Sequence, residues 1–517
     1  MWWRSSNYTT NGSSLSHCEW PAIRCNVGGS VVEIYMRDVY LGDKFQKFNF
    51  SSFPNLEVLF LDNTGLQGSI PPEIGTLSKL TRLYLSGNKL TGNLPLSLAN
   101  LTQLETFVIS SNLISGSIPE ELGNLKNLCT LDLSNNTLTG PIPSTLSLLT
   151  GLSDLDLSSN EISGSIPSEI RFLKNLGYLD LQQNKLTGPL PSCLWHLTNL
   201  TYLSLNSNQI NGSITAEIGN MKNLEELSLA WNQISGSIPA EIANCISLHN
   251  ITLSHNYLTG TISFDISNLY LLVYLDLSYN NLSGFIPRTI NHLTVLETLS
   301  LNWNQINGSI PTEIIGCQSL RHLTLSHNNI SGDIPFELGD SQPLELLDLS
   351  YNNLTGNIPI FSISIKEINL SYNSLQGQIP NGYLNCTPDT FIGNKDLCGN
   401  IQGFHPCFPN SPNSFSKKKT SPNNNKSIVH QIKIIVPLSF FLVFLLLGCI
   451  FLSQRGDKKT KLDSSEPKNG DLFSIWNYDG KLHMKTSSKQ QRTLTLATAS
   501  GQVVMVVFTK YSCLVVK

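Results

Sequence analysis

Charged residues are scarce in this 517-residue sequence, and neither sign of charge predominates. They make up 14% of the chain, and 33 Lys and Arg stand against 37 Asp and Glu, for a formal net charge of −4. Proteins that bind nucleic acid carry a clustered excess of basic residues. The composition therefore predicts no nucleic-acid partner.

Residue combinations that carry catalysis or hold a metal are also missing. The histidines do not stand beside cysteines or carboxylates at metal-ligand spacing, and the serine-rich segments provide no base-activated nucleophile. We therefore expect no cofactor, no metal and no catalytic residue, so a binding function is the alternative to pursue.

What the sequence does contain is an asparagine every 24 residues. Around each runs the pattern L-x-L-x-x-N-x-L-x-G-x-I-P, as in residues 179–191, and this period and pattern are typical of leucine-rich repeats. Thr64 precedes the series in phase, and Asn373 follows it after a shortened turn. The regular positions are Asn88, Asn112, Asn136, Asn160, Asn184, Asn208, Asn232, Asn256, Asn280, Asn304, Asn328 and Asn352.

The repeat pattern predicts an α/β solenoid of about 14 coils with a parallel concave sheet. In L-x-L both leucines point inward from a short strand, and the buried asparagine amides would form a ladder that satisfies backbone groups. Glycine permits a positive φ, and the following proline keeps that segment extended. Thr215 and Ser263 replace this proline, which we interpret as local tolerance.

Two close cysteine pairs lie at the ends of the repeats, Cys18 with Cys25 and Cys398 with Cys407. A solenoid exposes its apolar core at both ends, so we expect disulfide-closed caps and an oxidising compartment; the alternative is four free thiols. Two further cysteines replace a core leucine and should be inert, and three have no assigned role: Cys245 and Cys317, then Cys129, Cys193 and Cys386.

N-glycosylation sequons are dense, although many arise from an Asn-, Ser- and Thr-rich composition alone. Asn250 and Asn369 fall on predicted concave strands, where a glycan would obstruct a ligand. The sequons that we expect to be modified are Asn100, Asn199, Asn211, Asn281, Asn307, Asn329, Asn353 and Asn385.

A run of 19 uncharged residues, 434–452, predicts a single transmembrane helix of roughly 28 Å. Together with the caps and sequons it predicts a plasma-membrane protein with residues 1–433 outside the cell. No apolar signal segment follows Met1, so we expect a truncated start. The predicted organisation is an N-terminal cap region (1–50), leucine-rich repeats (51–380), a C-terminal cap (381–407), a flexible stalk (408–433), the transmembrane helix (434–452) and a cytoplasmic juxtamembrane and disordered tail (453–517).

This arrangement resembles plant leucine-rich-repeat receptor-like kinases over roughly residues 2–481. The similar strings include C-E-W at 18–20, G-N-K-D-L-C-G at 393–399 and D-L-F-S-I-W-N-Y-D-G at 471–480. The resemblance implies an ectodomain that recognises an extracellular ligand, commonly a peptide. It also implies a cytoplasmic Ser/Thr kinase that signals after pairing with a co-receptor.

That kinase is missing from the sequence. Residues 453–517 are too few for a two-lobed domain and contain no H-R-D, D-F-G or G-x-G-x-x-G. Back-translation of residues 483–517 with synonymous codons, read two bases later, permits a continuous frame containing G-x-G-x-x-G-x-V. We hypothesise that a frameshift removed the kinase, so that the chain is not an enzyme; an unrelated tail is the alternative.

Seven large side chains directly before ladder asparagines predict a ligand-binding ridge on the concave face. The same position in the N-terminal half holds Gly87, Ser111, Asn135, Ser159, Gln183 and Ser207. Alternatively, a duplication of residues 225–296 as 297–368 copied the ridge without function, or the rings only pack on one another. The ridge residues are Trp231, His255, Tyr279, Trp303, His327, Tyr351 and Tyr372.

A second column stacks Asp132, Asp156 and Asp180, with Asp154 beside it. Like charges at this spacing repel unless something offsets them, and a basic ligand segment could do so. The alternative is that L-D-L is a common filler of such repeats.

These features together predict a single-pass cell-surface receptor-like protein that binds an extracellular peptide or protein. It would signal through a co-receptor or adaptor receptor kinase, or act as a decoy. One alternative is a fragment or frameshifted product of a leucine-rich-repeat receptor Ser/Thr kinase. Another is a soluble inhibitor of secreted hydrolases, against which the predicted span argues.

Overall fold

The computed structural model describes residues 16–340, 343–361, 365–383 and 386–407, and five strands between 476 and 516. The chain divides into two compact units between Ser411 and Pro412. The predicted stalk and transmembrane segment, 408–452, lie outside the described residues. Among those that are described, no helix has both the length and the apolar character needed to cross a membrane.

The first unit is built on one 16-stranded sheet, which is parallel except between its first two strands. Without those two, fourteen strands remain, in agreement with the predicted number of coils. The strands are β1 (Ile23–Cys25), β2 (Val31–Tyr35), β3 (Val58–Phe60), β5 (Arg82–Tyr84), β7 (Thr106–Val108), β9 (Thr130–Asp132), β11 (Asp154–Asp156), β13 (Tyr178–Asp180), β15 (Tyr202–Ser204), β17 (Glu226–Ser228), β19 (Asn250–Thr252), β21 (Tyr274–Asp276), β23 (Thr298–Ser300), β25 (His322–Thr324), β27 (Leu346–Asp348) and β29 (Glu367–Asn369).

Strands that follow the ladder asparagines form four smaller parallel sheets. They are β4 (Gln67–Gly68), β6 (Lys89–Gly92), β8 (Leu113–Ser117), β10 (Thr137–Gly140), β12 (Glu161–Gly164), β14 (Lys185–Pro189) and β16 (Gln209–Asn211); β18 (Ser235–Ser237) and β20 (Tyr257–Thr259); β22 (Ser283–Gly284), β24 (Gln305–Gly308), β26 (Asn329–Asp333) and β28 (Asn353–Thr355); and β30 (Gln376–Gln378) and β31 (Asp396–Cys398).

The remaining side of the coils consists of 3-10 helices, so the expected α/β character is wrong for the helical part. Each typical segment has only five residues between an extended cap residue and a buried leucine, and it closes with bonds such as Leu101 N–H to the Leu98 carbonyl. Five residues are too few for a stable α-helix. The segments are η1 (His17–Glu19), η2 (Gly42–Lys47), η3 (Phe50–Ser52), η4 (Pro72–Thr76), η5 (Leu96–Asn100), η6 (Glu120–Asn124), η7 (Ser144–Leu148), η8 (Ser168–Phe172), η9 (Ser192–His196), η10 (Ala216–Asn220), η11 (Ala240–Asn244), η12 (Phe264–Asn268), η13 (Arg288–His292), η14 (Thr312–Gly316), η15 (Asn381–Tyr383) and η16 (Pro388–Thr390), and one short α-helix is described, α1 (Glu337–Asp340).

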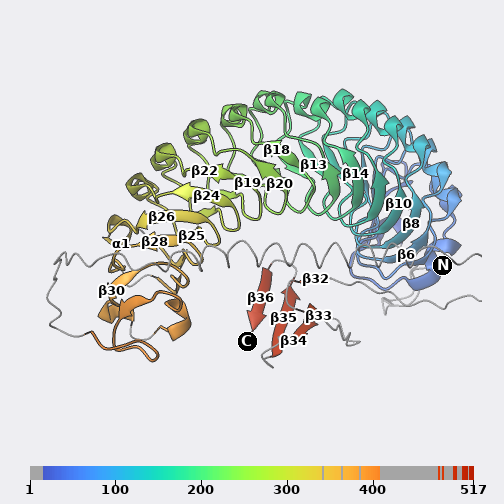
Figure 1. The fold of residues 1–517 in the computed structure, drawn as a ribbon. Helices are drawn as coiled ribbons and strands as arrows, with labels where there is room; N and C mark the ends of the chain where they lie inside the picture. The colour runs from blue at the N-terminus through green and yellow to red at the C-terminus, as the bar shows by residue number, and fades with distance from the viewer. Residues whose placement is uncertain are drawn as a thin grey trace, which may run out of the picture. The chain divides into compact units, whose positions relative to one another are not determined.

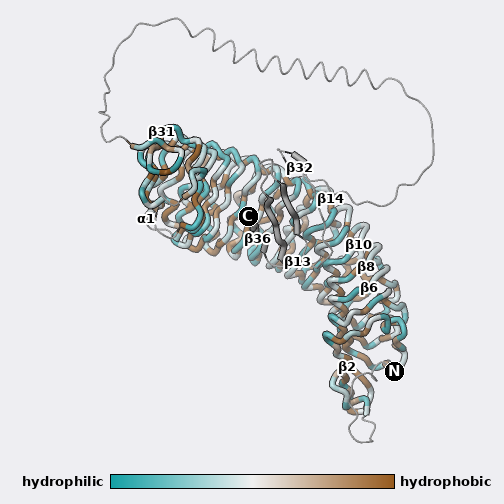
Figure 2. The backbone as a smooth tube through the Cα atoms, turned by 90° about the horizontal axis from the view of Figure 1, so that it is seen from below, coloured by the Kyte–Doolittle hydropathy of each residue, from teal (hydrophilic) through white to brown (hydrophobic). Residues whose placement is uncertain are grey.

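The coils of the first unit follow an arc, with the 3-10 helices on its outer side and the long sheet on its inner side (Figure 1). Hydrophobic and hydrophilic residues alternate along each coil (Figure 2). The central residue of each repeat strand faces inward, in register with its neighbours, as Leu155 lies between Leu131 and Leu179. All three are at most 2% exposed. The apolar core is therefore one continuous column through the stack.

The asparagine ladder has the predicted role. The Asn160 amide nitrogen donates to the carbonyls of Leu157 and, one coil earlier, Leu133. Its side-chain oxygen accepts from the Leu138 N–H at 2.9 Å. Thr64 occupies the first rung, where its hydroxyl donates to the Leu61 carbonyl at 2.8 Å.

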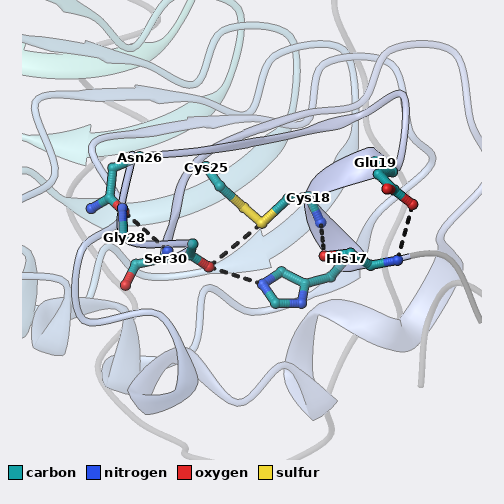
Figure 3. The surroundings of a disulfide bond; sticks show 9 residues. His17, Cys18, Glu19, Cys25, Asn26, Gly28 and Ser30 are labelled. Atoms are coloured by element: carbon teal, nitrogen blue, oxygen red, sulfur yellow. Dashed lines mark hydrogen bonds between the residues drawn. A yellow bond between two sulfur atoms is a disulfide. The ribbon is translucent and has the colours of Figure 1, made fainter.

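Both predicted disulfides are present, Cys18–Cys25 and Cys398–Cys407. Figure 3 shows the N-terminal one, where the Cys18–Cys25 bond lies beside the His17 ring and His17 Nε2 is 3.1 Å from the Gly29 carbonyl. The remaining described cysteines are free; Cys245 and Cys317 are buried, Cys129 is exposed, and Cys193 and Cys386 are intermediate.

In the second unit the structure describes strands only. An antiparallel pair joins β32 (Trp476–Asn477) to β33 (Gly480–Lys481), and a three-stranded antiparallel sheet joins β34 (Thr493–Ala497), β35 (Val503–Thr509) and β36 (Ser512–Val516). The β-branched content of β35 and β36 favours strand pairing.

Candidate ligand-binding surface

The predicted ridge exists as a continuous stack, but it does not lie on the concave strands. Trp231, for example, follows the end of β17 at Ser228 by three residues and lies on the turn that leads to the ladder asparagine. The ridge therefore borders the long sheet along the carboxyl ends of its strands. The column follows the strands instead of lying on them because each strand beside it is only three residues long.

Neighbouring ridge rings stack face to face from coil to coil. Ring centroids lie 3.5 Å apart for Trp231 and His255 and 5.5 Å apart for Tyr279 and Trp303, the extremes of the series. All six pairs are within 18° of parallel. Most ring faces are consequently covered by another ring, and the ring edges are the parts left for solvent.

All seven ridge residues adopt a left-handed backbone, with φ between 52° and 57°. This conformation costs about 1–2 kcal/mol for a non-glycine residue, and a stacked aromatic pair returns about 0.5–1.5 kcal/mol. The non-glycine residues of the N-terminal half, such as Ser159 and Ser207, adopt the same left-handed backbone without rings. The backbone cost therefore does not distinguish the ridge; its exposed ring edges do.

The edges carry polar groups, namely indole N–H, phenol O–H and imidazole nitrogens. Burial lowers the pKa of the His255 and His327 imidazoles, and the nearby carboxylates Asp276 and Asp348 oppose this only in part. Both rings are consequently neutral at pH 7. The ridge offers hydrogen-bond donors and acceptors without a fixed charge.

The aspartate column is in register on the long sheet, since Asp156 pairs with both Asp132 and Asp180. Each carboxylate also caps its own turn, as Asp132 does by accepting from the Ser134 backbone N–H at 3.0 Å. Local capping accounts for L-D-L without a ligand. The mutual repulsion of the three charges remains.

Asp180 is the most buried member of the column, at 2% exposure. Burial raises the pKa of its carboxyl to about 6, with a further upward contribution from Asp156. Gln182 donates to it from both backbone and side chain, at 2.9 Å each. The Asp180 carboxyl therefore ionises close to neutral pH, and a cation bound beside it would favour the charged form.

The sequons divide into two groups by position. Those on or beside the smaller sheets follow the ridge column in sequence, and Asn281, Asn329 and Asn353 each come two residues after a ridge residue. Asn250 and Asn369 lie on β19 and β29 as expected. Asn385 is outside the described residues; of the other expected sites, all are exposed except the intermediate Asn307: Asn100, Asn199, Asn211, Asn281, Asn329 and Asn353.

Two aromatic groups on the long sheet were not predicted from the sequence. Tyr35 stacks on Phe60 at 4.2 Å near the N-terminal cap, and Tyr178 stacks on Tyr202 at 4.4 Å beside Asp180. The sequence could have revealed both pairs, because the two residues of each pair occupy equivalent strand positions in adjacent coils.

Family models support this architecture. Models described as leucine rich repeat match residues 102–162, 164–210 and 246–306, and shorter single-repeat models match 55–77, 79–101, 223–245, 319–341, 343–362 and 364–386. The matches are distributed along the first unit, from the third strand of the long sheet to the C-terminal cap.

Two curated relatives come from Arabidopsis thaliana. The chain is 34% identical to MDIS1-interacting receptor like kinase 2 over 105 residues, which is 19% of this chain and 9% of that protein. It is 37% identical to the leucine-rich repeat receptor-like serine/threonine-protein kinase RGI4 over 74 residues, 14% of this chain and 7% of that protein. The matched region thus spans under a tenth of either relative.

Solved structures match over more of the chain. The ectodomain of the plant membrane receptor kinase GASSHO1/SCHENGEN3 from Arabidopsis thaliana, in complex with CASPARIAN STRIP INTEGRITY FACTOR 2, is 32% identical with a TM-score of 0.60; the match covers 71% of this chain and 50% of that one. The plant peptide hormone receptor RGFR1, in complex with RGF2, is 32% identical with a TM-score of 0.53, and 72% and 71% are covered.

Proposed function

Because the chain belongs to the leucine-rich-repeat family and is homologous to plant leucine-rich-repeat receptor-like kinases, we propose that its solenoid binds an extracellular peptide. The observation that carries this proposal is the ridge. Seven large rings occupy a costly left-handed position that small or polar residues fill in the N-terminal half of the repeats. Large rings that expose amphipathic edges are typical of binding hot spots.

The similarity to peptide-bound relatives supports the ligand class. RGFR1 is a peptide hormone receptor, and its solved ectodomain covers most of the first unit of this chain at 32% identity. The particular peptides belong to those relatives. The proposal takes from them only that a solenoid of this kind presents a peptide-binding surface. The aspartate column would take part by meeting basic residues of the peptide.

A binding screen with ridge variants tests the proposal. Purified chain and a variant with Trp231, Trp303 and Tyr351 changed to alanine would be screened with the same peptide library. A matched control changes two exposed aromatics away from the ridge to alanine, Phe264 on η12 and Phe336 directly before α1. We expect peptide affinity to fall at least tenfold in the ridge variant only; undiminished affinity there would remove the ridge from the proposal.

We further propose that the protein is anchored at the plasma membrane by residues 434–452 and does not phosphorylate anything itself. Signalling would then require a partner receptor kinase, or the protein would act as a decoy. Proteolysis of intact cells tests the orientation: residues 16–407 should be accessible from outside.

The alternative is that the chain is a fragment or frameshifted product of a working receptor Ser/Thr kinase. It is favoured by the homology to receptor-like kinases. Sequencing the transcript across the codons for Gly480 to His483 separates the two readings. A transcript in which the kinase frame continues from these codons without the shift would support the alternative. A transcript that carries the shift would support a receptor-like protein without a kinase.

A further inference from the structure

The two ends of the ridge differ. At the C-terminal end, Tyr372 packs against Gly393, where an added Cβ would come within 2.8 Å of the Tyr372 ring and 2.9 Å of its Cα. The Tyr372 backbone N–H also donates to the Ile392 carbonyl at 2.7 Å. The cap backbone therefore closes this end, and nothing as large as a side chain fits there.

At the N-terminal end, the last ring has one uncovered face. Trp231 stacks on His255 with one face, and on its other side the adjacent coil presents Ser207 in the same left-handed position. Backbone bonds join these coils directly, such as Ser207 N–H to the Ala230 carbonyl at 2.9 Å. Trp231 is 58% exposed, whereas Trp303, the same residue type inside the stack, is 46% exposed. The open indole face is the one flat aromatic surface that the ridge leaves for another group.

The surface next to this face is acidic. Strands β9, β11, β13, β15 and β17 contain no Lys or Arg, and their acidic residues are Asp132, Asp154, Asp156, Asp180 and Glu226. No salt bridge described in residues 16–407 involves any of these five. Toward the other end of the sheet, by contrast, Glu345 binds both Arg321 and Lys366. On the six strands beyond β17, Asp276, Asp348 and Glu367 also form no described salt bridge. They are more widely spaced, so the uncompensated charge is denser on the side of Trp231 where the stack is open.

The sequons leave the same end accessible. Asn281, Asn329 and Asn353 follow Tyr279, His327 and Tyr351 by two residues, so glycans there would border the C-terminal part of the ridge. The equivalent positions after Trp231 and His255 are Gln233 and Tyr257, which are not acceptors. Asn211 is an expected acceptor four residues after Ser207, and Asn307 follows Trp303 at the same spacing. The acceptors that come two residues after a ridge ring therefore leave the Trp231 end less crowded than the C-terminal end.

We infer that an arginine side chain of a basic peptide stacks on the open face of Trp231 and occupies the space above Ser207. This rests on the proposed peptide-binding function and specifies its ligand chemistry. A guanidinium is planar and cationic, so it continues a stack of rings and is attracted to the indole face. Strands lie about 4.8 Å apart, so the half-buried Asp156 on β11, three strands from β17, is roughly 14 Å from that strand along the sheet. An extended peptide spans this distance in about four residues, so a second basic group would reach the carboxylate.

One substitution tests the occupied space without removing the indole. Ser207→Tyr extends the stack by one ring, in the arrangement that Tyr279 has on Trp303, and Ser207 already has the φ of 56° that this column requires. Ser159→Tyr is the matched control, because it adds the same ring to the same column two coils away and leaves Trp231 open. Circular dichroism of both variants establishes that they fold.

The probe is a random phage-displayed peptide library, selected on the full chain. Selected peptides are then resynthesised with each arginine replaced by lysine, citrulline or tryptophan. We expect binders to contain arginine, and affinity to fall about tenfold with citrulline at one position, since cation–π attraction at a partly desolvated site is of that size. Ser207→Tyr should produce the same loss, and Ser159→Tyr none.

The outcomes separate the two proposals. If no peptide binds the wild-type chain, the proposed function itself fails. If peptides bind without dependence on arginine, or if Ser207→Tyr leaves their affinity unchanged, peptide recognition stands and the arginine site is wrong. Binders in which tryptophan replaces arginine without loss would show that an aromatic group is the occupant, which also overturns the inference.

Discussion

Removal of one rung of the asparagine ladder offers a quantitative test of how the coils are held together. In Asn160→Ala the lost bonds differ in consequence. The Leu133, Leu157 and Ser158 carbonyls each keep another donor, Asn136 at 3.2 Å, Asn184 at 2.9 Å and the Asn135 backbone N–H at 2.9 Å respectively. The Leu138 N–H, whose acceptor is the Asn160 side-chain oxygen, is left without a protein partner.

The expected cost follows from this count. An orphaned buried N–H costs about 1–3 kcal/mol, and each of the weakened carbonyl bonds contributes about 0.5–1.5 kcal/mol. We therefore expect Asn160→Ala to destabilise the surrounding coils by about 3 kcal/mol. Asn160→Thr should cost less, because a threonine hydroxyl can donate to the carbonyl three residues earlier, as Thr64 does on the first rung.

Hydrogen exchange read by mass spectrometry over residues 133–162 measures the effect locally, which matters because long repeat arrays need not unfold in one step. Urea unfolding followed by circular dichroism provides the global value. A loss below about 1 kcal/mol for alanine would refute the reasoning that an orphaned N–H dominates. A loss for threonine far smaller than the loss for alanine would refute it too, because threonine regains a carbonyl bond and leaves the Leu138 N–H without its acceptor.

Three further outcomes are expected. The folded state raises the Asp180 pKa from 3.8 to about 6, so ionisation of this carboxyl should reduce the free energy of unfolding as pH rises from about 4 to about 6. Asp180→Asn should remove that loss. Urea titrations at each pH should show a gain of about 2–3 kcal/mol for the variant at pH 7 and no gain near pH 3. Gly393→Ala should destabilise the C-terminal cap by more than about 2 kcal/mol, because its φ is +84° and a Cβ would meet Tyr372, whereas Gly382→Ala, with open space around it, should be nearly neutral in thermal melts. Iodoacetamide should modify exposed Cys129 in the folded chain and spare Cys317, whose thiol pKa is raised to about 12 by burial, as peptide mapping would show.

Much of the candidate site could be read from columns of residues. Equivalent positions in adjacent coils become spatial neighbours, so the order Trp231, His255, Tyr279 already implied contact, and the structure shows the rings stacked. What the column could not give was the face on which it lies. That depended on the strand ending at Ser228, before the turn that carries Trp231.

For the aspartate column, the sequence predicted the position of the residues but not their local environment. Its register was predictable, but the capping of each turn by its own carboxylate depends on local geometry, as between Asp132 and Ser134. The burial that sets Asp180 apart from the others also arises only when Tyr178 and Gln182 close around it. Spacing alone assigns the three residues the same environment.

The sequence by itself determined the coil, because a 24-residue period with inward leucines, one amide per turn and cysteine pairs at both ends has one compact solution: identical turns stacked with their carbonyls bridged from rung to rung. Only the tertiary structure decided that the outer segments are 3-10 helices, that Gly393 closes one end of the ridge and that Trp231 leaves the other open. Those features depend on the distance and angle between successive coils, which no single repeat contains.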